Sequence, residues 1–455
     1  MIHSDGDESA GVAMTNGTGK ARIIEADRSQ LSWDLIDLDA WLPADRLARL
    51  IWAFTGTLDL SALYAAIKSI EGEAGRPAID PRVLLALWLY ATAKGTGSAR
   101  ELDRLCRQDL AYRWLAGGVP LNYHTLADFR VGQAAFLDKL LTESLTALLA
   151  AGVLSLEEII VDGTKVRAPA SRKSYLRAGG LEKAHQAAKD RVEALKAEVE
   201  ADPAASNRRS RAAQERAARE RLEKVEAARE ALEKLQTEKE ARKKTHAKDE
   251  SKKKEPAAST TDPDARRMRF ADGAVRAGYN MQVAVTADHG FILGIDVTDR
   301  RNDAGFARPM AEAVEVRLGK TPGRLLADTN YATAEDIEAL GGRAENPIPV
   351  YAPPQPMSED IKPESLARRK VRLEKEPPAV KEWRQRMETP EAAEMMKKRK
   401  RIELVNAQTK DRGLAYLPVR GLVKAKAIAL WHALTHNLMT AIRLDAVTMN
   451  GMAAA

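Results

Sequence analysis

The chain has 455 residues, a formal net charge of +7 at pH 7 and a sequence pI of about 9.2. This length predicts two or three domains with a full hydrophobic core, and the basic balance suits a polyanionic partner. Cys106 is the single cysteine, which excludes an intrachain disulfide and any metal site made of several thiolates.

The N-terminus does not have the pattern of a signal peptide, because no basic start is followed by an apolar core. The longest apolar stretch, residues 83–93, is too short for a helix that spans a bilayer, which needs about 20 residues. We therefore expect a cytoplasmic protein with no membrane partner. Residues 1–30 are polar and glycine-rich, and we expect them to be disordered.

Residues 31–150 have the periodicity of helices. Apolar side chains recur every three or four positions, as in Leu47, Leu50, Ile51 and Phe54. Three helix starts are indicated by Asp80-Pro81, by Ser98 with Glu101 in a capping box, and by Asn122.

Arginines are interspersed along these predicted helices, and Arg100, Arg104 and Arg130 are the candidate DNA contacts. Several short helices with such arginines suit a helix-turn-helix-like DNA-binding domain over residues 31–150. An ordinary helical bundle with solvated arginines fits the same pattern.

A change of character follows at Ile159-Ile160-Val161, a β-branched run that predicts a buried strand closed by Asp162. Residues 172–258 are dominated by Ala, Glu, Lys and Arg, and their apolar spacing predicts two long helices folded back as a coiled-coil hairpin with a basic linker behind it. The pattern fits a solvated spacer as well as a dimerisation or DNA-contacting arm.

Strand patterns return after this insertion. Residues 279–297 alternate with period two around a turn at Asp288-His289-Gly290, which predicts a hairpin. Asn302-Asp303 is expected to cap a helix running to Leu318. A strand is predicted at 323–328, ending on Asp328, then a helix from Thr333, a short strand at 347–350, a helix with Glu403 and a long helix over 421–444.

Three acids stand out in this order of elements. Asp162 and Asp328 each follow an apolar run, where a carboxylate is held rigidly at the edge of a sheet. Glu403 lies on a predicted helix with Arg399 and Lys410 one and two turns away, on the same face. Three carboxylates of this kind can hold two hard divalent cations about 3.5–4 Å apart, as in metal-dependent cutting of nucleic acids.

A histidine pair on the last helix is a decoy. His432 and His436 have the spacing of zinc ligands, but Ala433 stands where a metalloprotease helix needs its Glu, and the setting is apolar. We expect a core or capping role.

The segments Asp162-Gly163-Thr164-Lys165-Val166, Ala327-Asp328-Thr329-Asn330-Tyr331 and Arg399…Glu403…Lys410 resemble the three blocks of bacterial insertion-sequence DDE transposases. The third block resembles the family's Tyr, Arg, Glu, Lys signature, except that Met396 stands in place of the Tyr. The resemblance covers residues 30–440. Residues 259–266 and 419–422 also look like this group.

The resemblance implies an α/β fold with a ribonuclease-H-like mixed sheet, over residues 151–171 and 259–445, interrupted by the helical insertion 172–258. It implies that Asp162, Asp328 and Glu403 are the catalytic acids and bind Mg²⁺, with Mn²⁺ as a substitute. Arg399 and Lys410 would hold DNA, Arg bidentately and Lys as a point charge.

The reaction implied by the resemblance uses one site twice. Water first cuts the phosphodiester at an element end and frees a 3′-hydroxyl, which then attacks target DNA. The DNA partners would be the terminal inverted repeats of the element and the target duplex. Two ends would be held in one synaptic complex, so we expect a homodimer. We expect the protein to be associated with the nucleoid. Two alternatives stay open: a catalytically silent DNA-binding relative, and a nuclease of this fold without strand transfer.

Overall fold

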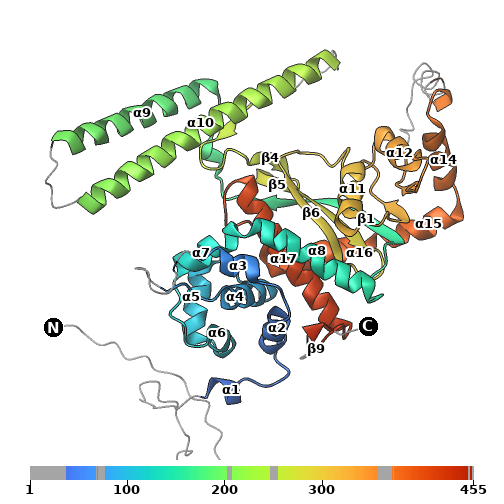
Figure 1. The fold of residues 1–455 in the computed structure, drawn as a ribbon. Coiled ribbons are helices and arrows are strands. Elements are labelled where there is room, and N and C mark those ends of the chain that lie inside the picture. Colours follow the sequence, from blue (N-terminus) through green and yellow to red (C-terminus); the bar gives the residue numbers. More distant parts are fainter. Residues whose placement is uncertain are drawn as a thin grey trace, which may run out of the picture.

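The computed structural model describes residues 37–67, 69, 77–201, 208–245, 255–355, 371, 373–448 and 451–452. A helical N-terminal region lies on one side of a mixed sheet, and a two-helix arm projects away from both (Figure 1). The predicted disorder of residues 1–30 falls outside the described residues, as does most of the predicted basic linker.

The N-terminal region is helical, as predicted. Its helices are α1 (Leu38–Trp41), α2 (Leu47–Gly56), α3 (Ser61–Ala65), α4 (Pro81–Ala93), α5 (Ala99–Gln108), α6 (Leu110–Ala116), α7 (Tyr123–Gly132) and α8 (Ala134–Ala150). Asp80 caps α4 by accepting the N–H of Arg82, with Pro81 in the first turn. Ser98 caps α5, but the Glu101 carboxylate accepts from Arg104 on its own helix and not from the Ser98 N–H, so the expected capping box is incomplete.

The main sheet has the strand order β4–β5–β1–β7–β8, with β6 beside β5. Its strands are β1 (Glu158–Arg167), β4 (Arg266–Arg269), β5 (Val275–Thr286), β6 (Ile292–Thr298), β7 (Arg324–Leu326) and β8 (Val350–Tyr351). β1 pairs antiparallel with β5 and parallel with β7, and β8 runs parallel to β7. The fold is therefore a mixed α/β one of the ribonuclease-H-like type, as the resemblance implied.

Helices cover both faces of this sheet. On one face lies α11 (Ala307–Leu318), where Gly294 of β6 lets Met310 and Val314 approach the strand backbone. It is followed along the chain by α12 (Ala334–Gly341), which starts with the predicted Thr333 cap and has a full capping box with Asp336.

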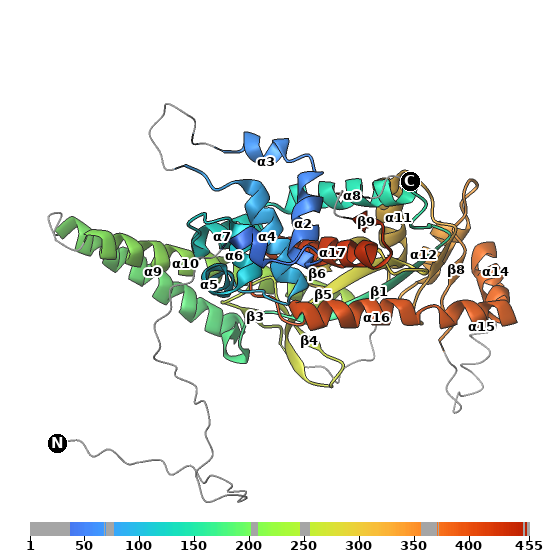
Figure 2. The ribbon, with the colours of Figure 1, turned by 90° about the horizontal axis from the view of Figure 1, so that it is seen from below.

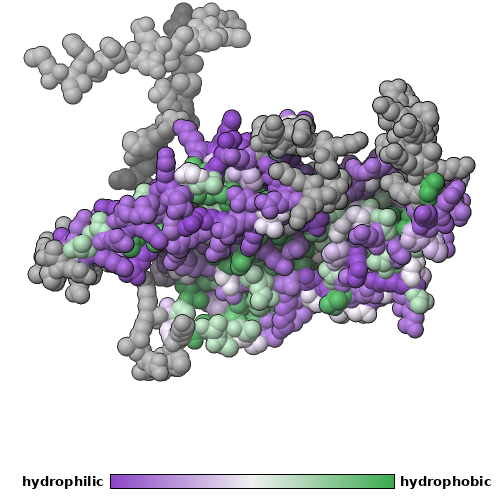
Figure 3. Space-filling view, turned by 90° about the horizontal axis from the view of Figure 1, so that it is seen from above, coloured by the Kyte–Doolittle hydropathy of each residue, from purple (hydrophilic) through white to green (hydrophobic). Residues whose placement is uncertain are grey.

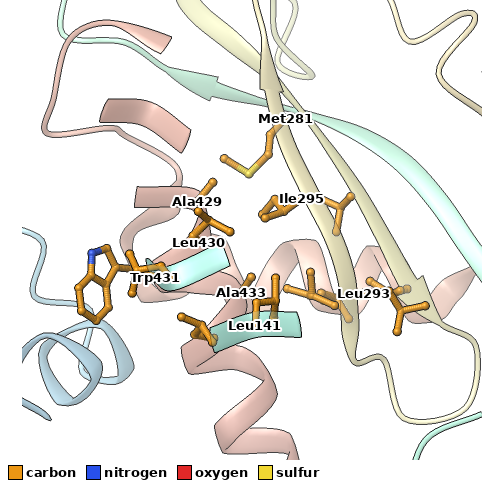
Figure 4. Close-up of a cluster of buried hydrophobic side chains, with 14 of the residues drawn as sticks. Leu141, Met281, Leu293, Ile295, Ala429, Leu430, Trp431 and Ala433 are labelled. Atoms are coloured by element: carbon orange, nitrogen blue, oxygen red, sulfur yellow. The ribbon is translucent and has the colours of Figure 1, made fainter. Parts of the chain in front are cut away.

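The other face is covered by α17 (Leu422–Arg443), which links the sheet to the N-terminal helices. Figure 4 shows Ala429, Leu430 and Ala433 of α17 against Met281, Leu293 and Ile295 of the β5–β6 hairpin, with Leu141 of α8 beside them. Trp431 points the other way, toward the N-terminal helices. Its ring lies 6.5 Å from that of Trp88 on α4. The predicted long helix thus packs on the sheet.

Between β8 and α17 the chain forms α14 (Pro378–Met387), α15 (Pro390–Lys397), α16 (Lys400–Thr409) and a π-helical turn, η2 (Lys410–Leu414). Figure 2 shows α15 and α16 in succession along the edge of the sheet, beside β1 and β8. The C-terminal segment adds a small pair, β9 (Val447–Thr448) with β10 (Gly451–Met452).

The arm is the predicted helical hairpin, formed by α9 (Ala178–Ala201) and α10 (Arg208–Thr245). Two small apolar clusters hold it together: Leu181 with Val225, Ala228 and Leu232, and Val192 and Leu195 with Ala218. Its visible face is mostly hydrophilic (Figure 3). The core of the arm is therefore separate from the main core.

The base of the arm is fastened to the body. The two-residue strands β2 (Tyr175–Leu176) and β3 (Ala258–Ser259) pair there, and the Ser174 and Ser259 hydroxyls lie 2.8 Å apart. Further along, the buried Asp262 carboxylate accepts from the Tyr279 hydroxyl at 2.7 Å and from the Gly421 N–H at 3.2 Å. The segment after the arm thus also holds the start of α17.

In the described part of the chain, the helices are all too short or too polar to cross a membrane.

Candidate active site

Two of the predicted acids lie side by side on neighbouring strands. β1 and β7 pair in parallel with Ile160 opposite Leu326, and two residues further along each chain come Asp162 and Asp328. Equal offsets from a parallel pair place both carboxylates on the same face of the sheet. The sheet therefore brings together residues that are far apart in the sequence.

The expectation that Asp162 closes its strand is wrong. β1 continues to Arg167, because β5 pairs with it as far as Arg167 opposite Gly278. Only the pairing with β7 stops, at Ile160. Asp162 therefore lies within a strand that is paired on one side and open on the other, and Asp328 follows the end of β7 as predicted.

Each carboxylate accepts a hydrogen bond from the next residue's N–H. The distances are 2.9 Å from Gly163 to Asp162 and 2.8 Å from Thr329 to Asp328. Burial raises the pKa of Asp162 to about 6, against the opposing effects of the Gly163 N–H and the Arg399 guanidinium. Asp328 is 59% exposed.

Helix α16 presents one face to these two acids. The Arg399 guanidinium lies 3.2 Å from Asp328 Oδ1, and Asn406 Nδ2 lies 3.3 Å from Asp162 Oδ2. Glu403 falls between them at helical spacing, four residues after Arg399 and three before Asn406. Lys410 follows one turn later, where burial lowers its pKa and the Asp162 carboxylate opposes that shift.

Immediately after this face the helix is irregular. Lys410 begins the π-helical turn η2, which includes Gly413 in a left-handed conformation at φ 99°. The positive φ of Gly413 interrupts the helical backbone here, so the helix that carries Glu403 ends in a kink soon after Lys410. Here the chain then returns to the sheet, where Leu417 N–H donates to the carbonyl of Arg167 at 2.9 Å.

The three acids do not form a finished metal site. Among the described residues, no three His, Cys, Asp or Glu side chains converge closely enough to hold an ion. The Glu403 side chain makes no hydrogen bond or ion pair in the described part of the chain. The donor set nevertheless fits Mg²⁺ or Mn²⁺, because two carboxylates share one face and Asp328 raises the pKa of Asp162 by repulsion.

Asp303 departs from its predicted role as a helix cap. α11 begins at Ala307 after Phe306, and no side chain caps it. The Asp303 carboxylate instead accepts from the buried amides of Asn280 at 2.6 Å and Gln282 at 3.1 Å. The local pattern Asn-Asp before a helix gave no sign of these partners, which lie on β5.

The candidate DNA contacts in the N-terminal region separate into two kinds. Arg100 is exposed and lies 5.0 Å over the Tyr123 ring, and Arg104 is exposed and pairs with Glu101. Arg130, by contrast, is only 7% exposed and lies 4.7 Å over the Trp88 ring. It also donates to the Gly97 carbonyl. Arg130 is therefore packed inside the helical region, unlike Arg100 and Arg104, and its contact with DNA stays a prediction.

The histidines of α17 have the expected core role. His436 Nε2 lies 2.9 Å from the Gly290 carbonyl oxygen, and burial lowers its pKa to about 4. Burial lowers the pKa of His432 to about 3. Met396, which replaces the Tyr of the third block, lies on α15 and is partly buried.

Two family models match the chain. A transposase DDE domain matches residues 236–438, a range that includes Asp328 and the whole α16 face. A second transposase domain, DUF772, matches residues 36–132, which are helices α1 to α7. β1, with Asp162, falls between the two matched ranges. No curated protein and no solved structure matches the chain.

The two matches cover different parts of the molecule. One lies over the N-terminal helices and the other over most of the sheet and its C-terminal helices. Both are transposase domains, and the mixed sheet with its helical N-terminal region is consistent with a ribonuclease-H-like DDE domain. The chain therefore belongs to the DDE transposases, the family that the three blocks in its sequence resemble.

Proposed function

We propose that this transposase cuts the ends of its element by metal-dependent hydrolysis and joins them to target DNA by transesterification. The observation that carries the proposal is the placement of Asp162 and Asp328 on one sheet face, opposite the helix face that bears Arg399, Glu403 and Lys410. This arrangement brings together carboxylates that can bind cations and positively charged side chains that can bind phosphate.

The catalytic part is proposed to be residues 151–171 and 259–445, with Asp162, Asp328 and Glu403 as the cation ligands. Mg²⁺, or Mn²⁺ in its place, would activate a water or hydroxyl and stabilise the leaving oxygen of the phosphodiester. Arg399 now pairs with Asp328. We infer that it turns to a DNA phosphate when that carboxylate takes up its ligand role, which frees Glu403 to approach.

Two steps would use this site. In the first, a water oxygen bonds to phosphorus, the P–O3′ bond breaks, and the water proton ends on the released 3′-oxygen. In the second, the oxygen of that 3′-hydroxyl bonds to a phosphorus of target DNA, the P–O3′ bond of the target breaks, and the proton of the attacking hydroxyl ends on the leaving 3′-oxygen. Lys410 lies near Asp162, where its charge would hold the phosphodiester in line.

The N-terminal helices, residues 31–150, are proposed to bind the element ends, with Arg100 and Arg104 among the phosphate contacts. Both are exposed on α5. Joining two ends in one complex would require two active sites, which favours a homodimer.

The test is cleavage of a plasmid that carries the gene's own flanking DNA, with Mg²⁺ and with Mn²⁺. Wild type should cut at the element ends and Asp162→Asn should not. Asp296→Asn is the matched control, because that half-exposed acid on β6 pairs with Lys426 at 3.3 Å and belongs to no proposed ligand set. It should cut like wild type.

The outcomes separate the alternatives. Binding of the flanking DNA without cutting, in either metal, would favour a silent DNA-binding relative. Cutting without joined products would favour a nuclease of the same fold. Equal cutting by wild type and Asp162→Asn would refute the proposed site.

A further inference from the structure

Asp303 lies against the backbone of β1 directly after Asp162. A Cβ at Gly163 would overlap Asp303 Oδ1 and would lie 2.9 Å from Gln282 Nε2. Only glycine therefore lets the Asp303 carboxylate reach this point of the strand. Gly163 and Asp162 are adjacent in β1, so their side-chain directions are opposite, and Asp303 supports the strand from the face behind the Asp162 carboxylate.

Two buried amides hold this carboxylate in place. Asn280 and Gln282, both fully buried on β5, donate to the same oxygen, Asp303 Oδ1. Gln282 stands opposite Gly163 in the β1–β5 pair. Amides at such positions are costly to bury unless they are hydrogen-bonded, so the anchor defines where Asp303 sits.

The same loop also contacts the turn that carries the second acid. The Gly305 N–H donates to the Tyr331 carbonyl at 3.0 Å, and the Tyr331 N–H donates to the Asp328 carbonyl at 3.0 Å. The Tyr331 ring is 1% exposed, which fixes that turn in the core. One short loop, residues 302–306, thus touches β1 beside Asp162 and the turn beside Asp328.

We propose that Asp303 is a positioning residue that sets the separation of Asp162 and Asp328, and so prepares their spacing for divalent cations. This inference rests on the proposed function, because it assumes that the two acids bind the cations. Outer partners of metal ligands typically change metal affinity by about 10–100-fold when they are removed. Asp303 would act in this way through the backbone of β1 and the Asp328 turn, without touching the ion.

The experiment is a titration of the DNA-free protein with Mn²⁺, in which free Mn²⁺ is measured by electron paramagnetic resonance. Asp303→Ala should weaken binding by about 10–100-fold. Asp303→Asn keeps an oxygen that can accept from both amides, so it should stay within a few-fold of wild type. Equal losses in both variants would indicate a direct ligand and would overturn the positioning role.

A second pair of variants tests the contact itself. Gly163→Ala should weaken Mn²⁺ binding because its methyl group displaces Asp303. In the Gly163→Ala background, Asp303→Ala should cost much less than it does alone, because both changes act through one contact. Fully additive losses would overturn the inference.

Two controls complete the design. Gln282→Met, which removes one donor at similar size, should give a smaller loss of the same kind and replaces Asp303→Ala if that variant does not fold. Asp296→Asn should bind like wild type. Equal binding by wild type and Asp162→Asn would overturn both the proposed function and this inference. Binding that depends on Asp162 but ignores Asp303 and Gln282 would overturn the positioning role alone.

Discussion

Cation binding should weaken steeply between pH 7 and pH 5, because one proposed ligand is an acid with a raised pKa. Burial raises the pKa of Asp162 to about 6, and a carboxylate must lose its proton to bind a cation. Roughly 90% of Asp162 is ionised at pH 7 and roughly 10% at pH 5 when its pKa is about 6. The half-saturating Mn²⁺ concentration should therefore rise about tenfold over this range.

The assay is the same Mn²⁺ titration without DNA, repeated at half-unit steps from pH 7 to pH 5. An aspartate with the ordinary value of about 3.8 would be more than about 90% ionised throughout, so its affinity would hardly change. A change of less than twofold across the range would refute the claim that Asp162 is a buried ligand with a raised pKa.

A variant of Arg399 tests the direction in which the pH dependence of cation binding shifts. Its positive charge lowers the pKa of Asp162. Arg399→Gln removes that charge and should move the drop in affinity to higher pH. A shift to lower pH would mean that another charge controls this carboxylate.

Three further outcomes are expected. The pKa of His432 is lowered to about 3 by burial, so its contribution to stability is present above about 6.5 and is lost as pH falls toward 3; at pH 5 the loss is about 2 kcal/mol. Urea midpoints at pH 7 and pH 5 should show a loss in wild type that is smaller by about this amount in His432→Met, where His436, whose pKa burial lowers to about 4, still contributes its own loss. Trp431→Ala should cost about 3–5 kcal/mol in the same assay, since the ring is 1% exposed and packs near Trp88, and a cost below about 1 kcal/mol would contradict this packing. Arg104→Ala should reduce the salt dependence of binding to the element ends by about one phosphate contact, and an unchanged slope would leave Arg104 as a partner of Glu101 only.

Features decided by neighbouring residues could be predicted from the sequence. The start of α12 needs only Thr333 and Asp336, three residues apart, and the start of α4 needs only Asp80 and Pro81. The β5–β6 hairpin follows from alternation around one turn. In each case the hydrogen bonds or the periodicity lie within a few residues, so the pattern contains the cause.

Features decided by distant partners could not be predicted in this way. β1 continues past Asp162 because β5 pairs with it. In the sequence, Gly163-Thr164-Lys165 does not continue the apolar run, so the local pattern predicted that the strand ends at Asp162. Arg130 looks like a helix-surface arginine, and only the fold brings Trp88 and the Gly97 carbonyl to it. Long-range contacts overrode the local pattern in both cases.

The candidate site shows the same division. Asp162, Asp328 and the α16 face could be named because each has a distinctive local setting, and the fold then placed two of the acids side by side. The sequence predicted a helix cap at Asp303 and not its actual contacts, because its partners Asn280 and Gln282 lie on β5 and look like ordinary polar residues in sequence.

The geometry of such a site depends on more than its acids. Asp162 lies on β1 beside Gly163, which must lack a side chain because Asp303 fills the space next to it. Asp328 lies at a turn that hydrogen-bonds to the loop 302–306 through Tyr331. A carboxylate that is only a few tenths of an ångström from its place still binds a proton or an arginine, as Asp328 binds Arg399. Two cations a fixed distance apart tolerate much less, because both reacting oxygens must be aligned at once. Substitution of the supporting glycine should therefore affect catalysis more than it affects folding or DNA binding.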